Sequence, residues 1–446
     1  MRFVSRRLFE KALARVEAGD FSSYIFQYPP MAAWDTVPSD AEVLSAWTEV
    51  AAAGRSPGLY VHVPFCKTKC TFCRFFVLED DSVDSHEEFV AALEREAALL
   101  SPRMKTASFS TLYFGGGTPS LLSERLLART FSALRRSFRL NPDAQITFEA
   151  NPEFLTPKKL AVLKAEGVNR LTIGVQSLDD RVIARVERTQ TNSAVASTFQ
   201  AARSAGIPYI NIDLMAGLPG QTTSSFRETF DQVLSWKPDT IHINPFAPTP
   251  FTRFSQRGGT RTDADVRRQR AMQDYAGRRM RKAGFRDLPH DAMAADPAAA
   301  NRQLEESVIG GNSFLGLGIG AVSRAAGRLR YVNVGSLRRY SQETAAGRLP
   351  IQKGARLTPR QNQIDFLLNR LWYGGVTDAD FRAAFALSIT EAFPDEFKRL
   401  EKCGALRRQP RMSWSVHPER QRAYFEIKRA LYEPEIIRAL TRPSTA

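Results

Sequence analysis

Three of the four cysteines of this 446-residue chain lie within eight consecutive positions, at Cys66, Cys70 and Cys73, whereas Cys403 lies near the C-terminus. A loop that curls through a C-x3-C-x2-C spacing can direct all three thiolates at one metal centre. Three thiolates leave one position open, and Arg74–Val77 offers no further Cys or His to complete a tetrahedral zinc site. We expect no signal peptide, and three clustered cysteines cannot all pair with one another. These two points argue against disulfides. The spacing therefore favours a [4Fe-4S] cluster with one open iron over a zinc knuckle.

Short apolar runs that follow one another along the chain predict strands, and the longer amphipathic stretches between them predict helices. Strand and helix alternating in this way are typical of βαβ units and a parallel sheet. The six runs are Leu59–Val63, Thr111–Phe114, Gln145–Glu149, Leu171–Val175, Tyr209–Met215 and Thr240–Asn244.

Polar or glycine-rich residues follow the later runs. They are Gly115–Pro119, Glu149–Pro152, Gln176–Ser177, Asp213 with Gly217–Gln221, and Asn244–Ala247. A glycine triplet alone is usually a turn. Polar residues after each of several successive strands are, however, expected where parallel strands end at a functional site. Glycines let a backbone approach a ligand closely and offer it N–H donors, and a carboxylate or amide can bind hydroxyl or ammonium groups.

The composition is that of an ordinary globular protein, with 43% hydrophobic and 24% charged residues, and the length predicts two or three domains. No apolar run is long enough for a membrane span. The net charge of +15 raises the question of a polyanionic partner. However, the basic residues are scattered and are not interleaved with aromatic residues as in a single-strand binding groove, so we expect solvated faces and no nucleic-acid partner.

We divide the chain into four parts: an N-terminal extension (1–57), an α/β unit (58–248), a linker with covering helices (249–306) and a mostly helical C-terminal domain (307–446). The first 20 residues predict an amphipathic surface helix. Within the extension, the aromatic segment Tyr24–Trp34 contains two prolines and is expected to be extended, either packed on the body or forming a flap over a site. The C-terminal part begins with a glycine-rich apolar run from Leu315 that we expect to be flexible. It then predicts three helices with a small wing, so a DNA-binding module is the competing class.

Five motifs together carry a resemblance. They are Tyr60-Val-His-Val-Pro-Phe-Cys66, Gly115-Gly-Gly-Thr-Pro-Ser120, Phe148-Glu-Ala-Asn-Pro152, Asn169-Arg-Leu-Thr-Ile-Gly-Val-Gln-Ser177 and Ile212-Asp-Leu-Met-Ala-Gly-Leu-Pro-Gly-Gln221. As a set they resemble the oxygen-independent coproporphyrinogen III dehydrogenase family of the radical S-adenosylmethionine (SAM) superfamily, over about residues 58 to 430. The resemblance implies a partial (β/α)6 barrel in a cytoplasmic enzyme. It also implies SAM on the open iron, and an electron from a flavodoxin or ferredoxin that gives a 5′-deoxyadenosyl radical.

Members of that family bind two SAM molecules, and the resemblance carries their contacts to this chain. His62 is left open between a packed neighbour and a hydrogen-bond donor to the cofactor. The residues that match contacts of the cluster-bound SAM are Tyr60, Gly116 and Glu149. Those that match contacts of the second SAM are Phe72, Gly117, Gln176, Arg188, Asp213, Ala247 and Val322. Arg188 is the most informative of these, because a buried guanidinium is costly unless it binds a carboxylate.

Two departures narrow the expected reaction. The dehydrogenases carry another cysteine two positions after the third ligand, where this chain has Phe75, and the haem chaperones carry a histidine where this chain has Val322. The leader Tyr24-x3-Tyr-Pro-Pro and Cys73-Arg-Phe-Phe resemble instead the two-SAM methyltransferases and cyclopropane-forming enzymes. These take hydrogen from the methyl group of the second SAM and add the carbon to an sp2 centre. We expect one-carbon transfer to an unsaturated or aromatic small molecule, with a coproporphyrinogen dehydrogenase-like or haem-metabolism enzyme and a non-enzymatic haem chaperone as alternatives.

Overall fold

The computed structural model describes residues 9–14, 27–288, 292–410, 412–417 and 420–441. Its main element is one twelve-stranded sheet in the order β14-β13-β12-β11-β1-β4-β5-β6-β7-β8-β10-β9, in which β10 (Ala292–Ala294) and β9 (Arg286–Asp287) form the edge beyond β8. The six predicted runs are six neighbouring parallel strands of this sheet, which confirms the α/β class and the partial barrel. These strands are β1 (Gly58–Val63), β4 (Ser108–Gly116), β5 (Arg139–Ala150), β6 (Arg170–Gln176), β7 (Tyr209–Ala216) and β8 (Thr240–Pro245).

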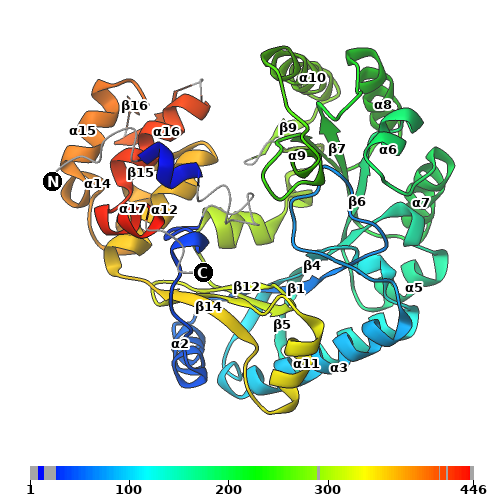
Figure 1. The fold of residues 1–446 in the computed structure, drawn as a ribbon, viewed down its shortest axis with the longest axis horizontal. Helices are drawn as coiled ribbons and strands as arrows, with labels where there is room; N and C mark the ends of the chain where they lie inside the picture. Colours follow the sequence, from blue (N-terminus) through cyan, green and yellow to red (C-terminus); the bar gives the residue numbers. More distant parts are fainter. Residues whose placement is uncertain (1–8, 15–26, 289–291, 411, 418–419, 442–446) are drawn as a thin grey trace.

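Helices cover the outer side of the curved sheet (Figure 1). Most begin at a Ser or Thr whose side chain accepts a hydrogen bond from a backbone N–H of the first turn, as Ser123 does before α4 and Thr222 before α8. Their apolar faces and the outward faces of the strands form one continuous core. The helices are α3 (Val83–Leu100), α4 (Glu124–Ser137), α5 (Pro157–Ala165), α6 (Asp180–Arg185), α7 (Asn192–Ser204), α8 (Thr223–Ser235) and, at the open side, α10 (Asp263–Lys282).

The sheet continues beyond β1 through four further strands. Strand β11 pairs with β1 in parallel, and β12, β13 and β14 follow in antiparallel order. The sequence predicts that these residues belong to the C-terminal domain and that the glycine-rich run from Leu315 is flexible. The glycines instead permit close strand packing, because a Cβ on Gly318 would lie 2.4 Å from the backbone oxygen of His62. The strands are β11 (Phe314–Gly318), β12 (Val322–Ala325), β13 (Leu329–Asn333) and β14 (Ile351–Arg356).

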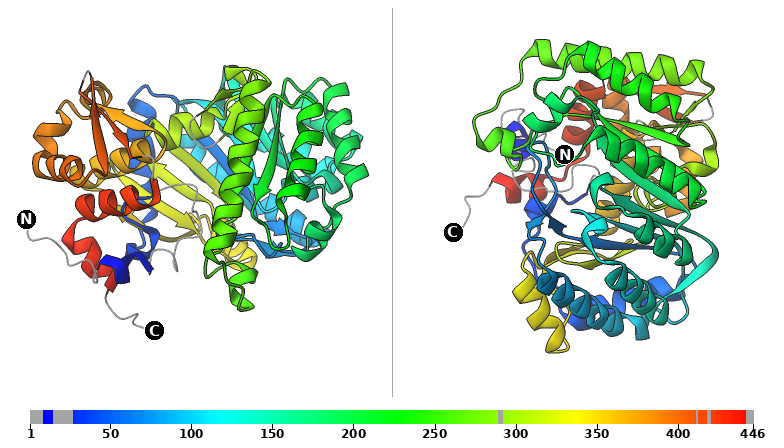
Figure 2. Two further views of the ribbon diagram at one scale, coloured as in Figure 1. Left: turned by 90° about the horizontal axis from the view of Figure 1, so that it is seen from above. Right: turned by 90° about the vertical axis from the view of Figure 1, so that its right-hand side faces the viewer.

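The C-terminal unit has a core of its own beside the β12–β14 end of the sheet, drawn in orange and red in Figure 2. It contains the three predicted helices α12 (Pro359–Trp372), α13 (Asp378–Phe385) and α15 (Pro394–Lys402). The predicted wing is part of a three-stranded sheet of β15 (Gly375–Thr377), β16 (Leu406–Gln409) and β17 (Ser413–Val416). Helices α14 (Ile389–Ala392), α16 (Arg420–Leu431) and α17 (Pro434–Thr441) were not predicted. The exact division into domains stays a prediction.

The segment 27–36, which we call the strap, runs from the C-terminal unit to the edge of the main sheet and leads to α2 (Asp40–Ala52). The backbone N–H of Tyr28 donates to Asp365 Oδ1 of α12 at 3.0 Å, and Gly354 of β14 donates to the backbone oxygen of Thr36 at 2.7 Å. The strap therefore packs on the body, one of the two expected placements, but the expectation of an extended aromatic segment is wrong at Met31–Ala33, which form a 3-10 helix. The rest of that segment, Tyr24–Phe26, lies outside the described residues, as does most of the expected N-terminal helix, of which residues 9–14 are helical.

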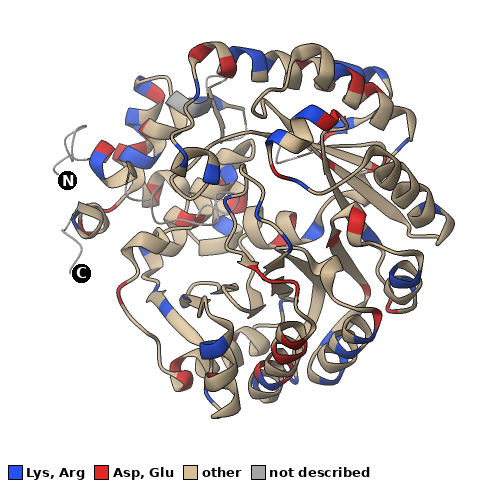
Figure 3. Ribbon diagram, turned by 45° about the vertical axis from the view of Figure 1, so that its right-hand side comes forward, with Lys and Arg blue, Asp and Glu red and all other residues tan. Residues whose placement is uncertain are grey.

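In the view of Figure 3, Lys and Arg alternate with Asp and Glu on the helices around the sheet, and many form ion pairs, such as Arg129 with Glu94 and Arg281 with Asp287. No described helix combines the length and the apolar composition that crossing a membrane would require.

Candidate active site

A cavity of about 800 Å³ opens at the carboxyl ends of the parallel strands. Every residue that the sequence analysis selected as a ligand or contact lines this cavity, although the ligand that each would bind stays a prediction. These residues are Tyr60, Cys66, Cys70, Phe72, Cys73, Gly116, Gly117, Glu149, Gln176, Arg188, Asp213, Ala247 and Val322.

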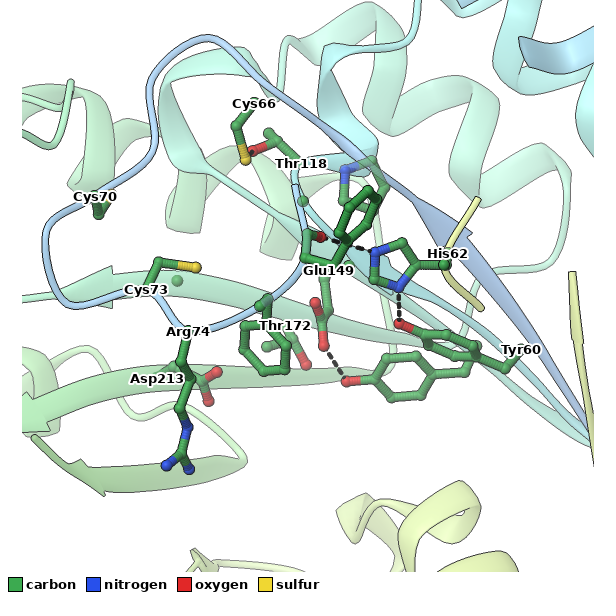
Figure 4. A pocket seen from close by; sticks show the side chains of 18 of the residues that line it. Tyr60, His62, Cys66, Cys70, Cys73, Arg74, Thr118, Glu149, Thr172 and Asp213 are labelled. Carbon is green, nitrogen blue, oxygen red and sulfur yellow. Dashed lines mark hydrogen bonds between the residues drawn. The ribbon is translucent and has the colours of Figure 1, made fainter. Parts of the chain in front are cut away.

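The loop that follows β1 carries the three clustered cysteines around one side of the cavity (Figure 4). Cys66 Sγ lies 3.4 Å from the Thr118 hydroxyl, and an N–H of Arg188 points at Cys70 Sγ from 3.8 Å. Removal from water raises the pKa of Cys66 to about 11 and, with the neighbouring thiols adding to the effect, that of Cys73 to about 12. Cys403 is exposed in the C-terminal unit and takes no part in this loop.

The donor set fits an iron–sulfur cluster. All three thiols line one cavity, and the hydroxyl and guanidinium groups beside Cys66 and Cys70 are the kind of donors that tune cluster sulfurs. Within the described ranges, no three Cys, His, Asp or Glu side chains converge on the position of one metal ion. A cluster does not require that convergence, because each thiolate binds a different iron.

The glycine triplet at the end of β4 holds the cysteine loop in place. The N–H groups of Gly117 and Thr118 donate to the backbone oxygens of Val63 and Phe65, both at 2.7 Å. A Cβ on Gly117 would lie 2.5 Å from the oxygen of Phe65, so only glycine permits this approach. The N–H of Gly117 is therefore used within the chain and does not face a ligand.

His62 connects Tyr60 to the end of the cysteine loop. Its Nε2 lies 3.1 Å from the backbone oxygen of Phe76, and its Nδ1 lies 3.0 Å from the hydroxyl of Tyr60. A carbonyl only accepts, so Nε2 carries the proton, and burial lowers the pKa of His62 to about 4, which leaves the ring neutral. Nδ1 must then accept from the Tyr60 hydroxyl, whose remaining lone pair can accept a hydrogen bond from a ligand in the cavity. His62 thus orients a predicted SAM contact.

Replacing His62 with Phe is expected to weaken SAM binding about tenfold, because Tyr60 then loses the acceptor that orients its hydroxyl. His62→Asn, whose amide oxygen can replace Nδ1 as the acceptor, is the matched control and should recover most of the affinity. Equilibrium dialysis with labelled SAM measures both variants, after iron and sulfide analysis has shown a full cluster. SAM affinity and cleavage that are unaltered in His62→Phe would assign the ring to packing alone.

The floor of the cavity is polar. The Tyr113 hydroxyl donates to Glu149 Oε1 at 2.5 Å, and desolvation, together with the negative charge of nearby Asp213, raises the pKa of Glu149 to about 7. The buried guanidinium of Arg170 donates to Thr172 Oγ1 at 3.1 Å and to the backbone oxygen of Ala299 at 3.0 Å. A ligand bound close to the cysteine loop would therefore find both hydrogen-bond donors and hydrogen-bond acceptors on the cavity floor.

A second polar group lies at the ends of β6 and β7. Arg188 donates through Nε to Gln190 Oε1 at 2.7 Å and through Nη2 to the backbone oxygen of Gly174. Neither of these partners, nor Cys70, is a carboxylate. A Cβ on Gly174 would lie 3.0 Å from the amide nitrogen of Gln176 and 3.4 Å from Arg188, so the glycine leaves room for both side chains. The guanidinium charge is therefore placed where a carboxylate in the cavity could pair with it.

The sequence analysis missed several lining residues that alternate with core residues along the strands. On β6 they are Arg170, Thr172 and Gly174, on β7 Asn211, and on β8 His242. Successive residues of a strand point to opposite faces, so polar residues at every second position of an apolar strand mark the cavity side. That period of two was the signal that could have found them.

Comparison with known proteins agrees with this geometry. Residues 60–233 match the radical SAM superfamily. The chain is 31% identical over 339 residues to an oxygen-independent coproporphyrinogen III oxidase of Bradyrhizobium diazoefficiens, covering 72% of this chain and 73% of the relative. It is 28% identical to the haem chaperone HemW of Bacillus subtilis, covering 80% and 94%.

The coproporphyrinogen III oxidase HemN of Escherichia coli, a solved radical SAM enzyme, superimposes with a TM-score of 0.75 at 26% identity, covering 89% of this chain and 98% of that one. The similarity thus extends over the cysteine loop, the parallel strands and most of the rest of the chain. The chain belongs to the radical SAM superfamily, within the family of oxygen-independent coproporphyrinogen III oxidases and HemW haem chaperones.

Proposed function

We propose that this chain is an enzyme that cleaves SAM reductively and transfers a one-carbon unit from a second SAM to an unsaturated or aromatic small molecule. Membership of the superfamily implies a [4Fe-4S] cluster and SAM. When bound, they supply the electron and the adenosyl group from which the 5′-deoxyadenosyl radical forms. We assign the supply of that electron to a flavodoxin or ferredoxin.

The observation that carries the proposal is the second polar group around Arg188. The cavity continues from the cysteine loop to this guanidinium, which donates to Gly174, Gln190 and Cys70 without a protein carboxylate among these partners. A partly desolvated guanidinium is stabilised by a carboxylate, and the methionine part of SAM carries one. Gln176 beside it offers both a donor and an acceptor.

In this proposal the chain's own residues divide the cavity between two ligands. Cys66, Cys70 and Cys73 hold the cluster, while Tyr60 and Glu149 bind the first SAM beside it. The second SAM lies against a different set of side chains, made of Phe72, Gln176, Arg188, Asp213, Ala247 and Val322, with the backbone of Gly117.

Two side chains favour one-carbon transfer over porphyrinogen oxidation and over haem binding, which are the functions of the relatives. Phe75 lines the cavity where the dehydrogenases of the family carry a further cysteine, so that thiol is missing from this chain. Val322 lines it where the haem chaperones carry a histidine, and an isopropyl group cannot ligate haem iron.

Incubating reconstituted enzyme with SAM deuterated in its methyl group tests the proposal. Hydrogen taken from that methyl group should place deuterium in 5′-deoxyadenosine, which mass spectrometry detects. Arg188→Ala should keep a full cluster yet bind one SAM fewer per chain and lose the labelled product. Arg181→Ala, which removes an exposed arginine of α6, is the matched control. Label absent from 5′-deoxyadenosine, or an unchanged SAM stoichiometry in Arg188→Ala, contradicts the proposal.

The second candidate is oxidation of coproporphyrinogen III. The 31% identity to the Bradyrhizobium oxidase favours it, as does the match to HemN over 89% of the chain. Consumption of coproporphyrinogen with unlabelled 5′-deoxyadenosine in the same incubation would select this activity.

A further inference from the structure

The cavity extends beyond the residues assigned to the cluster and the two SAM molecules. It ends between the strap and strands β12–β14, where Met31, Val322, Val332 and Lys353 line it. We call this region the strap end.

The register of the strands places three of these side chains in one row. Val322 of β12 is directly opposite Val332 of β13, and Val332 is directly opposite Lys353 of β14. Directly opposed residues of antiparallel strands project from the same face of the sheet. The row therefore presents two apolar side chains followed by one ammonium to the cavity.

The strap forms the adjoining apolar wall. Met31 and Trp34, both 4% exposed, pack with Val332 in a small apolar cluster that Val322 and Ala355 join. The indole N–H of Trp34 donates to the backbone oxygen of Pro29 at 2.8 Å, which fixes the strap internally. An apolar ligand that lies in the cavity against Met31 and the valine row would cover their remaining exposed apolar surface.

The charge at this end is positive. Lys353 Nζ donates to the backbone oxygen of Met31 at 2.8 Å, and an ammonium has three N–H donors. Arg339 lies further out on the cavity rim, where it pairs with Glu343. The carboxylates of the described lining, Glu149 and Asp213, belong to β5 and β7 on the floor.

We propose that the strap end is the acceptor site and that it binds an apolar, unsaturated small molecule through a carboxylate on Lys353. This inference rests on the proposed function and gives the class of its acceptor. The apolar row then holds the unsaturated part of the acceptor between Lys353 and Val322, the residue shared with the second SAM site. The ammonium of Lys353 sets the orientation of the acceptor.

Binding can be measured without turnover, which separates this inference from the proposed function. The probes are indole-3-acetate and coproporphyrin III, each compared with its methyl ester, added anaerobically to the reconstituted holoenzyme saturated with SAM. Isothermal titration calorimetry is expected to show at least one carboxylate binding tenfold or more tightly than its ester. Lys353→Gln keeps a donor for the Met31 oxygen and removes the charge, so it should erase that preference while leaving ester binding unchanged.

Two further variants make the result decisive. Lys402→Gln, which removes an exposed lysine of α15, should retain the preference for carboxylates. Met31→Ala should weaken acid and ester alike by about fivefold, because both lose the same apolar contact. Equal affinity for acids and esters in the unmodified protein, or a carboxylate preference that persists in Lys353→Gln, overturns the assignment. Neither result depends on whether 5′-deoxyadenosine carries label.

Discussion

Alanine in place of Cys66, Cys70 or Cys73 is expected to abolish iron and sulfide binding together with SAM cleavage. Each thiolate binds a different iron of a [4Fe-4S] cluster, so a single substitution leaves that iron without its protein ligand. The three thiols line the same cavity on one loop, and no other cysteine of the chain can replace them, because Cys403 is exposed in the C-terminal unit. Iron and sulfide analysis after anaerobic reconstitution, the visible absorbance of the cluster, and quantification of 5′-deoxyadenosine give the measurement.

Cys403→Ala is the matched control and should retain the cluster and full cleavage. Circular dichroism should show that all four variants are folded, since the cysteine loop lies at the cavity rather than in the core beneath the helices. A full cluster in Cys66→Ala, Cys70→Ala or Cys73→Ala would contradict the ligand assignment. Zinc bound in place of iron by the unmodified protein would contradict the cofactor itself.

The part of the site that could be predicted from the sequence is the part that is local in the chain. The thiols lie within one loop, and the polar strand ends follow the apolar runs that they terminate, so a parallel sheet necessarily gathers them at one edge. Arg188 and Val322 required the resemblance, because their own surroundings in the sequence contain no period or motif that marks a ligand.

The remainder depends on contacts between distant residues. Lys353 lies opposite Val332 only because β14 pairs with β13, and Met31 lies over this row because the strap crosses from the C-terminal unit. The glycines of the run from Leu315 argue against a strand, because glycine is depleted in strands, but Gly318 is needed for the close approach to His62. Propensity alone does not indicate such an approach.

The attachment of the strap also depends on a buried ion group that links the main sheet to the C-terminal unit. Asp365 Oδ2 of α12 lies 2.9 Å from Arg324 Nη2 of β12 and 2.5 Å from Arg330 Nη2 of β13, with all three side chains at most 3% exposed. The other carboxylate oxygen accepts from the N–H of Tyr28. One carboxylate thus pairs with two buried guanidinium groups and holds the strap.

Asp365→Ala should therefore destabilise the protein by about 3–5 kcal/mol, because it leaves two buried guanidinium groups without their carboxylate. Urea denaturation of the reconstituted protein measures the loss. The exposed pair of Arg281 with Asp287 provides the control, since Asp287→Ala should cost less than about 1 kcal/mol.

Asp365→Asn separates the two tasks of this carboxylate. It keeps an acceptor for the N–H of Tyr28 but removes the negative charge. Its free energy of unfolding should therefore fall by most of the amount expected for Asp365→Ala, while the strap stays in place. Limited proteolysis should then cleave within 27–36 faster in Asp365→Ala than in Asp365→Asn. Equal cleavage rates in the two variants would show that Tyr28 does not depend on this carboxylate for its position. Because Met31 follows Tyr28 by three residues, release of the strap in Asp365→Ala should also weaken binding at the strap end of the cavity while the cysteine loop retains its cluster.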